Sequence, residues 1–151
     1  MCTRFVIYEC LYKPRKNISE EEEILKSRLI QERNKGNFKD HHISIADLQD
    51  VEVLQNSKNL SKGELSSIVF AKRTNQAFLT DDQGARKLAN KFMDNSKVQT
   101  TPQLFGWLYF ENILIDSEKE QVVRDHLELN RPLVKFLNEM YFESMRMKLY
   151  K

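Results

Sequence analysis

Cysteine is scarce in this chain, and the glycine-rich signatures of common active sites are missing. Cys2 and Cys10 are its only cysteines, too few for a disulfide framework or a metal site by themselves, so we expect reduced thiols in a cytoplasmic protein. The phosphate-binding loop, the dinucleotide-binding fingerprint, the nucleophile elbow and the His-Glu-x-x-His motif are all absent. The chain therefore lacks the patterns that mark many nucleotide-dependent enzymes, serine hydrolases and zinc proteases.

Long apolar runs and a strong net charge are also missing. The densest apolar stretch, Leu104–Phe110, covers seven residues, whereas a membrane-spanning helix needs roughly 20. Glu9 interrupts the short apolar run at the start of the chain, and no small-residue cleavage site follows it, so we expect no signal peptide. The formal charge is only +2, so any basic groove for nucleic acid has to be local. These absences predict a protein with no membrane association.

The chain has the size and composition of one globular domain. Its 151 residues are 40% apolar and 30% charged, which is ordinary for a protein with one hydrophobic core. No internal repeat, low-complexity stretch or linker argues for a second domain. We therefore expect residues 1–151 to form a single domain.

The most informative stretch runs from Gly63 to Asp82. Its first part has apolar residues at positions 65, 68, 69 and 71, which fall on one face of a helix. A polar break with a turn-like Thr74-Asn75 leads to Ala77–Thr80, a short apolar run that predicts a buried strand. The pair Asp81-Asp82 follows at once. Because an α/β sheet places ligand sites at the carboxyl ends of its strands, this pair is a candidate for metal binding.

Capping residues and hydrophobic periodicity predict the elements on either side of this stretch. In chain order they are a helix or strand at 4–13, a helix from a capping box at Ser19 to Gly36, a strand at 41–45, a helix at 46–54, a polar loop at 55–61, a helix at 84–93, a strand at 97–100, a helix at 101–110, a second capping box at Ser117 and a last helix from about Arg131. The helix at 101–110 is expected to be buried or to contact a partner, with Trp107 in the core. Adjacent histidines at 41 and 42 point to opposite faces of a strand, so we expect no zinc site there.

This alternation of helices and strands favours an α/β protein with a helical C-terminal third. Only three strand candidates are visible, which is few for this number of helices. The pattern by itself therefore predicts a small parallel sheet covered by helices.

Four carboxylates are candidate ligands, namely Glu9, Glu64, Asp81 and Asp82. Hard divalent cations take oxygen ligands and need neither histidine nor cysteine, so a set made of carboxylates suits Mg²⁺ or Mn²⁺. Such an ion aligns a water for attack on a phosphodiester and neutralises charge on the leaving oxygen. A structural interpretation exists beside the functional one, because Glu64 suits the first turn of a helix and Asp82 suits an N-cap.

The order of these motifs resembles the second half of a PIN domain, the nuclease fold of many toxin–antitoxin ribonucleases. Gly63-Glu64 and Thr80-Asp81-Asp82 resemble the G-E and T-D-D signatures of a bacterial branch of PIN-like proteins. The strand-then-helix of Val98–Leu108 is similar to the one that follows in that branch. Phe5–Leu11 resembles the family's helix whose glutamate, here Glu9, is a further ligand. The resemblance covers residues 1–112, and 113–151 are then a C-terminal helical extension.

The resemblance implies a three-layer PIN-like parallel sheet flanked by helices. The family's first strand ends in the aspartate of an Asp-x-Ser or Asp-x-Asn motif and has no counterpart in this chain, which implies an N-terminally truncated domain. It also implies a Mg²⁺- or Mn²⁺-dependent endoribonuclease, impaired by the missing strand. Glu9, Glu64 and Asp82 would be its catalytic metal ligands and Asp81 a further acidic residue at the metal. RNA would be the substrate, and an antitoxin-like protein a partner.

Two alternatives stay open. Arg86 and Lys87, directly after the acidic pair, are candidates for contacts to substrate phosphates, but they also suit a solvated helix face. The whole chain is alternatively a catalytically inactive interaction module. In that case the apolar helix at 104–110 and the methionine-rich C-terminal helix form a homodimer or bind an antitoxin-type partner.

Overall fold

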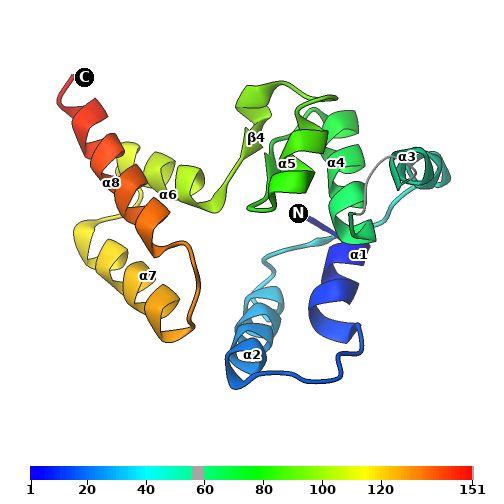
Figure 1. The fold of residues 1–151 in the computed structure, drawn as a ribbon, viewed down its shortest axis with the longest axis horizontal. Coiled ribbons are helices and arrows are strands. Elements are labelled where there is room, and N and C mark those ends of the chain that lie inside the picture. The colour runs from blue at the N-terminus through cyan, green and yellow to red at the C-terminus, as the bar shows by residue number, and fades with distance from the viewer. Residues whose placement is uncertain (56–59, 151) are drawn as a thin grey trace. The chain divides into compact units, whose positions relative to one another are not determined.

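The computed structural model describes residues 1–55 and 60–150, and most of their regular structure is helical (Figure 1). The chain divides into two compact units, residues 1–98 and 99–151. The first unit contains β1 (Cys2–Thr3), α1 (Arg4–Ile7), the π-helix η1 (Tyr8–Tyr12), α2 (Glu20–Asn34), β2 (Asp40–His41), α3 (Ile45–Gln55), α4 (Lys62–Thr74), β3 (Phe78–Leu79), α5 (Gln83–Ala89) and the 3₁₀-helix η2 (Asn95–Lys97). The strand β4 (Val98–Gln99) crosses the boundary, and the second unit contains α6 (Thr101–Phe110), α7 (Asp116–Glu128) and α8 (Val134–Lys148).

The strands form two separate two-stranded sheets. β1 runs parallel to β2, with Cys2 opposite Asp40 and Thr3 opposite His41, and β3 pairs with β4. The α/β class is therefore confirmed in its coarse form, as a mostly helical chain with two small sheets. A three-layer sheet is not among the described elements, because helix caps follow β3 and β4 almost at once and end each strand after two residues.

α4 is the central helix of the first unit. It packs against α1, α3, α5, β1 and β3 (Figure 1). Its apolar face carries Leu65, Ile68, Val69 and Ala71, all buried as the sequence periodicity predicts. The same core includes Val51, Phe78, Ala85, Leu88, Ala89 and Val98 from the surrounding elements. Burying one large aliphatic side chain stabilises the fold by about 1.5–3 kcal/mol, so this face is the main source of stability in the unit.

Side chains cap the start of α4, and the backbone of Asn75 closes its end. Ser61 Oγ accepts a hydrogen bond from the N–H of Glu64 at 3.2 Å, and the Glu64 carboxylate accepts one from the N–H of Ser61 at 2.8 Å. At the other end Asn75 has a φ of +58°, the left-handed conformation that closes a helix. The predicted helix and the turn after it are confirmed.

The first predicted capping box is only half formed. The Ser19 hydroxyl accepts from the N–H of Glu22 at 3.2 Å and begins α2 as expected. The Glu22 carboxylate, however, accepts from Arg15 at 2.7 Å. α2 has no buried residue, so it is held by its ends and its charges rather than by an apolar face.

The strand predicted at 41–45 is wrong beyond its first residue, His41. The strand is Asp40–His41, and the chain then enters α3. Ser44 causes the change, because its N–H and its hydroxyl both donate to the Asp47 carboxylate, at 3.0 and 2.8 Å. This reciprocal cap favours a helix start over an extended strand. The polar loop predicted at 55–61 falls partly on residues 56–59, which lie outside the described residues.

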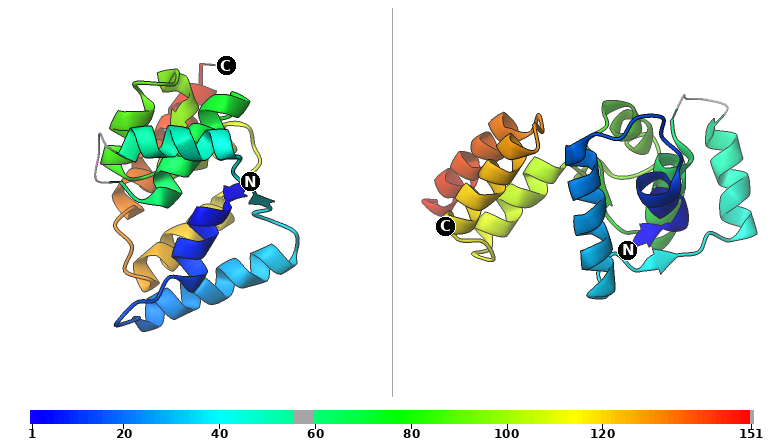
Figure 2. Two further views of the ribbon diagram at one scale, coloured as in Figure 1. Left: turned by 90° about the vertical axis from the view of Figure 1, so that its right-hand side faces the viewer. Right: turned by 90° about the horizontal axis from the view of Figure 1, so that it is seen from below.

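The second unit is a small bundle in which α6 packs on α8 (Figure 2). Phe105, Tyr109 and Leu137 form its buried core. Gly106 permits the close approach of the two helices, since a Cβ there would lie 3.2 Å from the Met140 backbone carbonyl oxygen. Trp107 is 56% exposed, so its predicted place in the core is wrong.

α7 begins one residue earlier than the predicted capping box. The helix starts at Asp116, where the Glu118 carboxylate accepts from the N–H of Ile115 at 2.8 Å. Tyr141 of α8 donates to the Asp116 carboxylate at 2.9 Å and fixes this helix start. No helix among the described residues combines the length and apolar character needed to cross a bilayer.

An ion pair between a buried carboxylate and a half-exposed arginine joins α3 to α4. Asp47 is only 3% exposed, and its carboxylate lies 2.9 Å from the Arg73 guanidinium. Arg73 also lies 3.2 Å from His41 Nε2, and the His41 ring packs on Phe70 with centroids 4.1 Å apart. The buried carboxylate is therefore satisfied by Ser44 and Arg73 together, as a charge in an apolar environment must be.

Arg73→Met should therefore destabilise the first unit. We expect a loss of about 2–3 kcal/mol in the free energy of unfolding, because the buried Asp47 carboxylate keeps Ser44 but loses its cation. Urea denaturation followed by circular dichroism measures this, with the exposed Arg124→Met as the matched control. A loss no larger than that of the control would show that the ion pair does not hold the two helices together.

Candidate functional site

Glu9 lies on an unusual turn of backbone. Residues Tyr8–Tyr12 form a π-helix, closed by a hydrogen bond from the N–H of Lys13 to the carbonyl of Tyr8 at 2.8 Å. Such turns are rare and frequently occur at functional sites. From this turn Glu9 Oε1 accepts a hydrogen bond from the N–H of Gly63 at 3.0 Å, across 54 residues of sequence.

Gly63 makes this contact possible. A Cβ at position 63 would lie 3.0 Å from the Glu9 carboxyl carbon and 3.3 Å from Val6 Cγ2, closer than normal packing allows. Steric crowding therefore explains why the residue before Glu64 is a glycine, which the sequence alone did not reveal. The glycine leaves room for the Glu9 carboxylate on the first turn of α4.

Glu9 and Glu64 both bind backbone N–H groups at the same helix start. Glu9 accepts from the N–H of Gly63, and Glu64 accepts from the N–H of Ser61 two residues earlier. Negative charge is favoured at this end of a helix because four backbone N–H groups there lack partners within the helix. Both carboxylates thus stabilise the fold, and each has a second oxygen that these backbone hydrogen bonds do not use.

Asp82 caps the next helix. Its Oδ1 accepts from the N–H of Ala85 at 2.6 Å, and its own N–H donates to Thr80 Oγ1 at 3.2 Å. A Cβ at Gly84 would lie 3.3 Å from Leu60 Cδ2, so the start of α5 packs on the segment that leads into α4. This contact joins the helix start after the T-D-D motif to the segment just before the G-E motif, and Asp81 is exposed next to Asp82.

The donor chemistry of these residues fits a hard divalent cation, since every candidate donor is a carboxylate oxygen. The described residues nevertheless contain no group of three or more histidine, cysteine or acidic side chains arranged to hold one ion. Glu9 and Glu64 are brought together, whereas Asp81 and Asp82 lie at the neighbouring helix start. The complete ligand set therefore remains a prediction.

The two candidate phosphate contacts differ in their surroundings. Lys87 is exposed, as a solvated face requires, but Arg86 is partly buried. Within residues 1–55 and 60–150, Arg86 Nε is buried and has no hydrogen-bond partner. A buried guanidinium N–H without an acceptor is costly, which makes Arg86 the better candidate to meet an anion.

The surroundings of the two cysteines disfavour a thiolate nucleophile. Burial raises the pKa of both the Cys2 and the Cys10 thiol. Reactive cysteines have a lowered pKa, because the thiolate is the nucleophile. Neither cysteine takes part in a disulfide.

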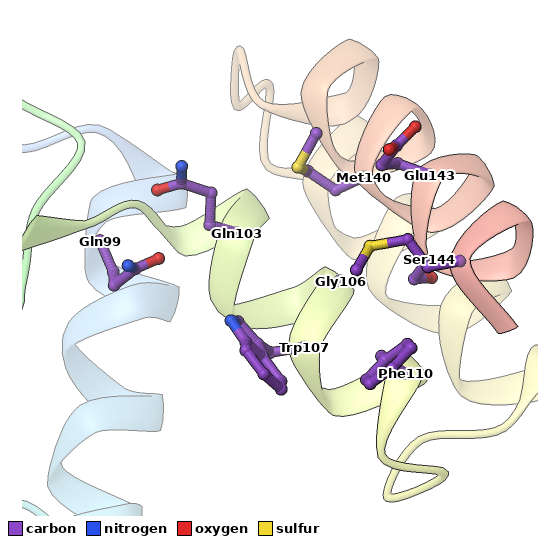
Figure 3. Close-up of a pocket in the computed structure, with 9 residues that line it drawn as sticks. Gln99, Gln103, Gly106, Trp107, Phe110, Met140, Glu143 and Ser144 are labelled. Carbon is purple, nitrogen blue, oxygen red and sulfur yellow. The ribbon is translucent and has the colours of Figure 1, made fainter. Parts of the chain in front are cut away.

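The second unit carries a separate groove between α6 and α8. Its volume is about 310 Å³, and Trp107, Phe110, Met140 and Met147 supply most of its apolar wall (Figure 3). Trp107 packs edge-on against Phe110 with centroids 5.8 Å apart. The sequence predicts Trp107 in the core. The signal against this prediction is spacing: Phe105 and Tyr109 are four residues apart and share the buried face of α6, whereas Trp107, two residues from each, does not.

Comparison with protein-family models, with curated proteins and with solved structures finds no match for this chain.

Gly63→Ala tests the contact between Glu9 and α4. We expect it to lower the free energy of unfolding by about 1–3 kcal/mol, because the new methyl group overlaps the Glu9 carboxylate. In a Glu9→Ala background the same substitution should cost less, since the overlapping group is gone and alanine is the better helix former. Thermal unfolding of the four proteins measures the coupling, and additive effects would contradict it.

Proposed function

We propose that the chain is a PIN-like protein that hydrolyses phosphodiester bonds of RNA with Mg²⁺ or Mn²⁺. The proposal includes the PIN-like architecture, with a parallel sheet flanked by helices. It is supported by the order of elements from α4 to α6, in which a helix opened by Gly63-Glu64 is followed by a strand that ends in Thr80-Asp81-Asp82.

One observation carries the proposal above the others. The Glu9 carboxylate accepts a hydrogen bond from Gly63, which is 54 residues away in the sequence. Gly63 belongs to the first turn of α4, which also contains Glu64. Ser61 and Glu64 cap the helix from within its own segment, and Glu9 adds a carboxylate to the same helix start from a distant one. Two carboxylates at one helix start are the beginning of an all-oxygen metal site.

The roles in the proposed reaction follow from these positions. Glu9, Glu64 and Asp82 would hold the ion through the oxygens that the backbone N–H groups leave free, and Asp81 would add negative charge beside them. The bound ion would supply a positioned water and neutralise charge on the leaving oxygen. Arg86 would meet a substrate phosphate through the end of its guanidinium group.

Asp82→Asn tests this assignment. Asparagine also caps helices, so the fold should persist, while Mn²⁺-stimulated cleavage of a fluorescently labelled RNA should fall at least about a hundredfold. Loss of a metal ligand is expected to exceed the 10- to 100-fold cost of losing a residue that only supports a ligand.

Asp94→Asn is the matched control for this substitution. Asp94 caps η2 through the N–H of Ser96 at 2.9 Å and lies outside the proposed site. It should cleave as the unmodified protein does. Equal cleavage by the Asp82→Asn protein would falsify the metal-ligand assignment, and calorimetric titration with Mn²⁺ would show whether the ion binds at all.

A second function is favoured by the groove in the second unit. In this alternative the chain is a non-catalytic interaction module, and the groove between α6 and α8 binds a second copy or an antitoxin-type partner. The exposed Trp107 supports it, because a large aromatic side chain beside an apolar groove is typical of a protein contact.

Trp107→Lys tests the homodimer form of this alternative. Trp107 is the only tryptophan of the chain, so a blue shift of its emission with increasing concentration would report burial of the groove directly. Light scattering after size-exclusion chromatography should show a dimer that Trp107→Lys converts to monomer. Ile113→Lys, which changes an exposed residue outside the groove, should leave the dimer intact. A monomer at all concentrations would contradict the homodimer.

A further inference from the structure

The first unit contains a larger cavity beside the π-helix. Its volume is about 580 Å³, and it lies between α1–η1 and the segment from Arg33 to Leu48. Aliphatic residues (Ile7, Ile43 and Leu48) and one acidic residue, Asp40, form part of its lining, and the rest is of two kinds. Phe5, Tyr8 and Tyr12 are aromatic, and Arg4, Arg33 and His42 are basic or can become so.

The two tyrosines are available for stacking. Tyr8 is 51% and Tyr12 is 67% exposed, although both line the cavity. They lie four residues apart on the same helical segment, so their rings project along one side of it. Exposed aromatic rings beside a hollow are costly in water unless something covers them.

The cations of the cavity are held in place. Arg33 donates to Asp40 at 2.6 Å and to the carbonyl of Phe38 at 3.1 Å, which fixes its guanidinium at the wall. The Arg33 hydrogen bond also keeps the pKa of Asp40 below its usual range, so this pair stays ionised near neutral pH. Arg4 is exposed, and no carboxylate among the described residues lies within ion-pair distance of it.

Charge is distributed unevenly along the chain. Residues 1–98 have 17 basic and 14 acidic side chains, whereas residues 99–151 have 7 and 8. The excess of positive charge thus belongs to the unit that contains the cavity. A weakly charged protein can bind a polyanion only through such a local concentration of cations.

We propose that this cavity binds single-stranded RNA, with bases stacked on Tyr8 and Tyr12 and the sugar-phosphate backbone beside Arg4 and Arg33. Aromatic platforms combined with cations along a groove are the general means of holding single strands without reading their sequence. The inference rests on the proposed function for the identity of the polymer. It goes further in naming the surface that holds the strand.

The position of the cavity relative to Glu9 supports this assignment. Tyr8 and Glu9 are consecutive residues of the π-helix, and Tyr8 lines the cavity while Glu9 contacts the first turn of α4. A strand stacked on Tyr8 would therefore contact the residue that precedes a proposed metal ligand in the sequence. The π-helix therefore carries both a proposed base-stacking residue, Tyr8, and a proposed metal ligand, Glu9.

Binding is measured separately from cleavage. The probe is a fluorescein-labelled 12-nucleotide oligoribonucleotide without secondary structure, titrated in EDTA and followed by fluorescence anisotropy. Tyr12→Ala should weaken binding about tenfold, within the range for loss of one stacked base. Tyr12→Phe should bind as the unmodified protein does, because the ring remains. Arg4→Gln should reduce the slope of log affinity against log salt by about 0.7.

Tyr150→Ala is the matched control, because Tyr150 is an exposed tyrosine in the other unit. The inference is overturned if Tyr12→Ala binds as Tyr150→Ala does, or if the unmodified protein does not bind the oligonucleotide. These results are distinguishable from failure of the nuclease proposal. Binding that depends on Tyr12 without any Mn²⁺-stimulated cleavage supports the cavity and rejects the nuclease. Mn²⁺-stimulated cleavage that the Tyr12→Ala substitution does not change supports the nuclease and rejects the cavity.

Discussion

The backbone N–H groups of the first turn of α4 are the constraint on which the first unit depends. This helix contributes the largest part of the core, and its start must be satisfied because it is packed against other elements. Ser61 and Glu64 cap it locally, and Glu9 adds a carboxylate from the other end of the unit. The same hydrogen bonds that stabilise the helix therefore bring together two of the residues proposed for the chemistry.

This arrangement joins stability and function in one place. A carboxylate that accepts one backbone hydrogen bond is oriented and keeps another oxygen for a ligand. The cost is that the helix start tolerates little change, since Gly63 has no room for a side chain. The neighbouring start of α5, capped by Asp82, is built by the same means. Proposed metal ligands thus coincide with helix caps on both helices.

The two units differ in what their surfaces offer. The first has an aromatic and basic cavity beside the Glu9 turn, suited to a charged polymer, whereas the second has an apolar groove with an exposed tryptophan, suited to protein. In both surfaces, an exposed aromatic residue directly follows a buried residue in the sequence. Tyr8 follows the buried Ile7, and Trp107 follows the buried Gly106. Exposure at these positions follows from which neighbouring helix each face meets.

Local order was predictable from the sequence by itself, and long-range contacts were not. The periodicity of Leu65, Ile68 and Val69 and the caps of α4 and α5 determined where those helices lie, because helix formation depends on neighbours within four residues. The extent of the sheets, the exposure of Trp107 and the contact between Glu9 and Gly63 were decided only in the tertiary structure. Each of these depends on residues far apart in the chain, and no spacing in the sequence encodes which distant segment will pack against which face.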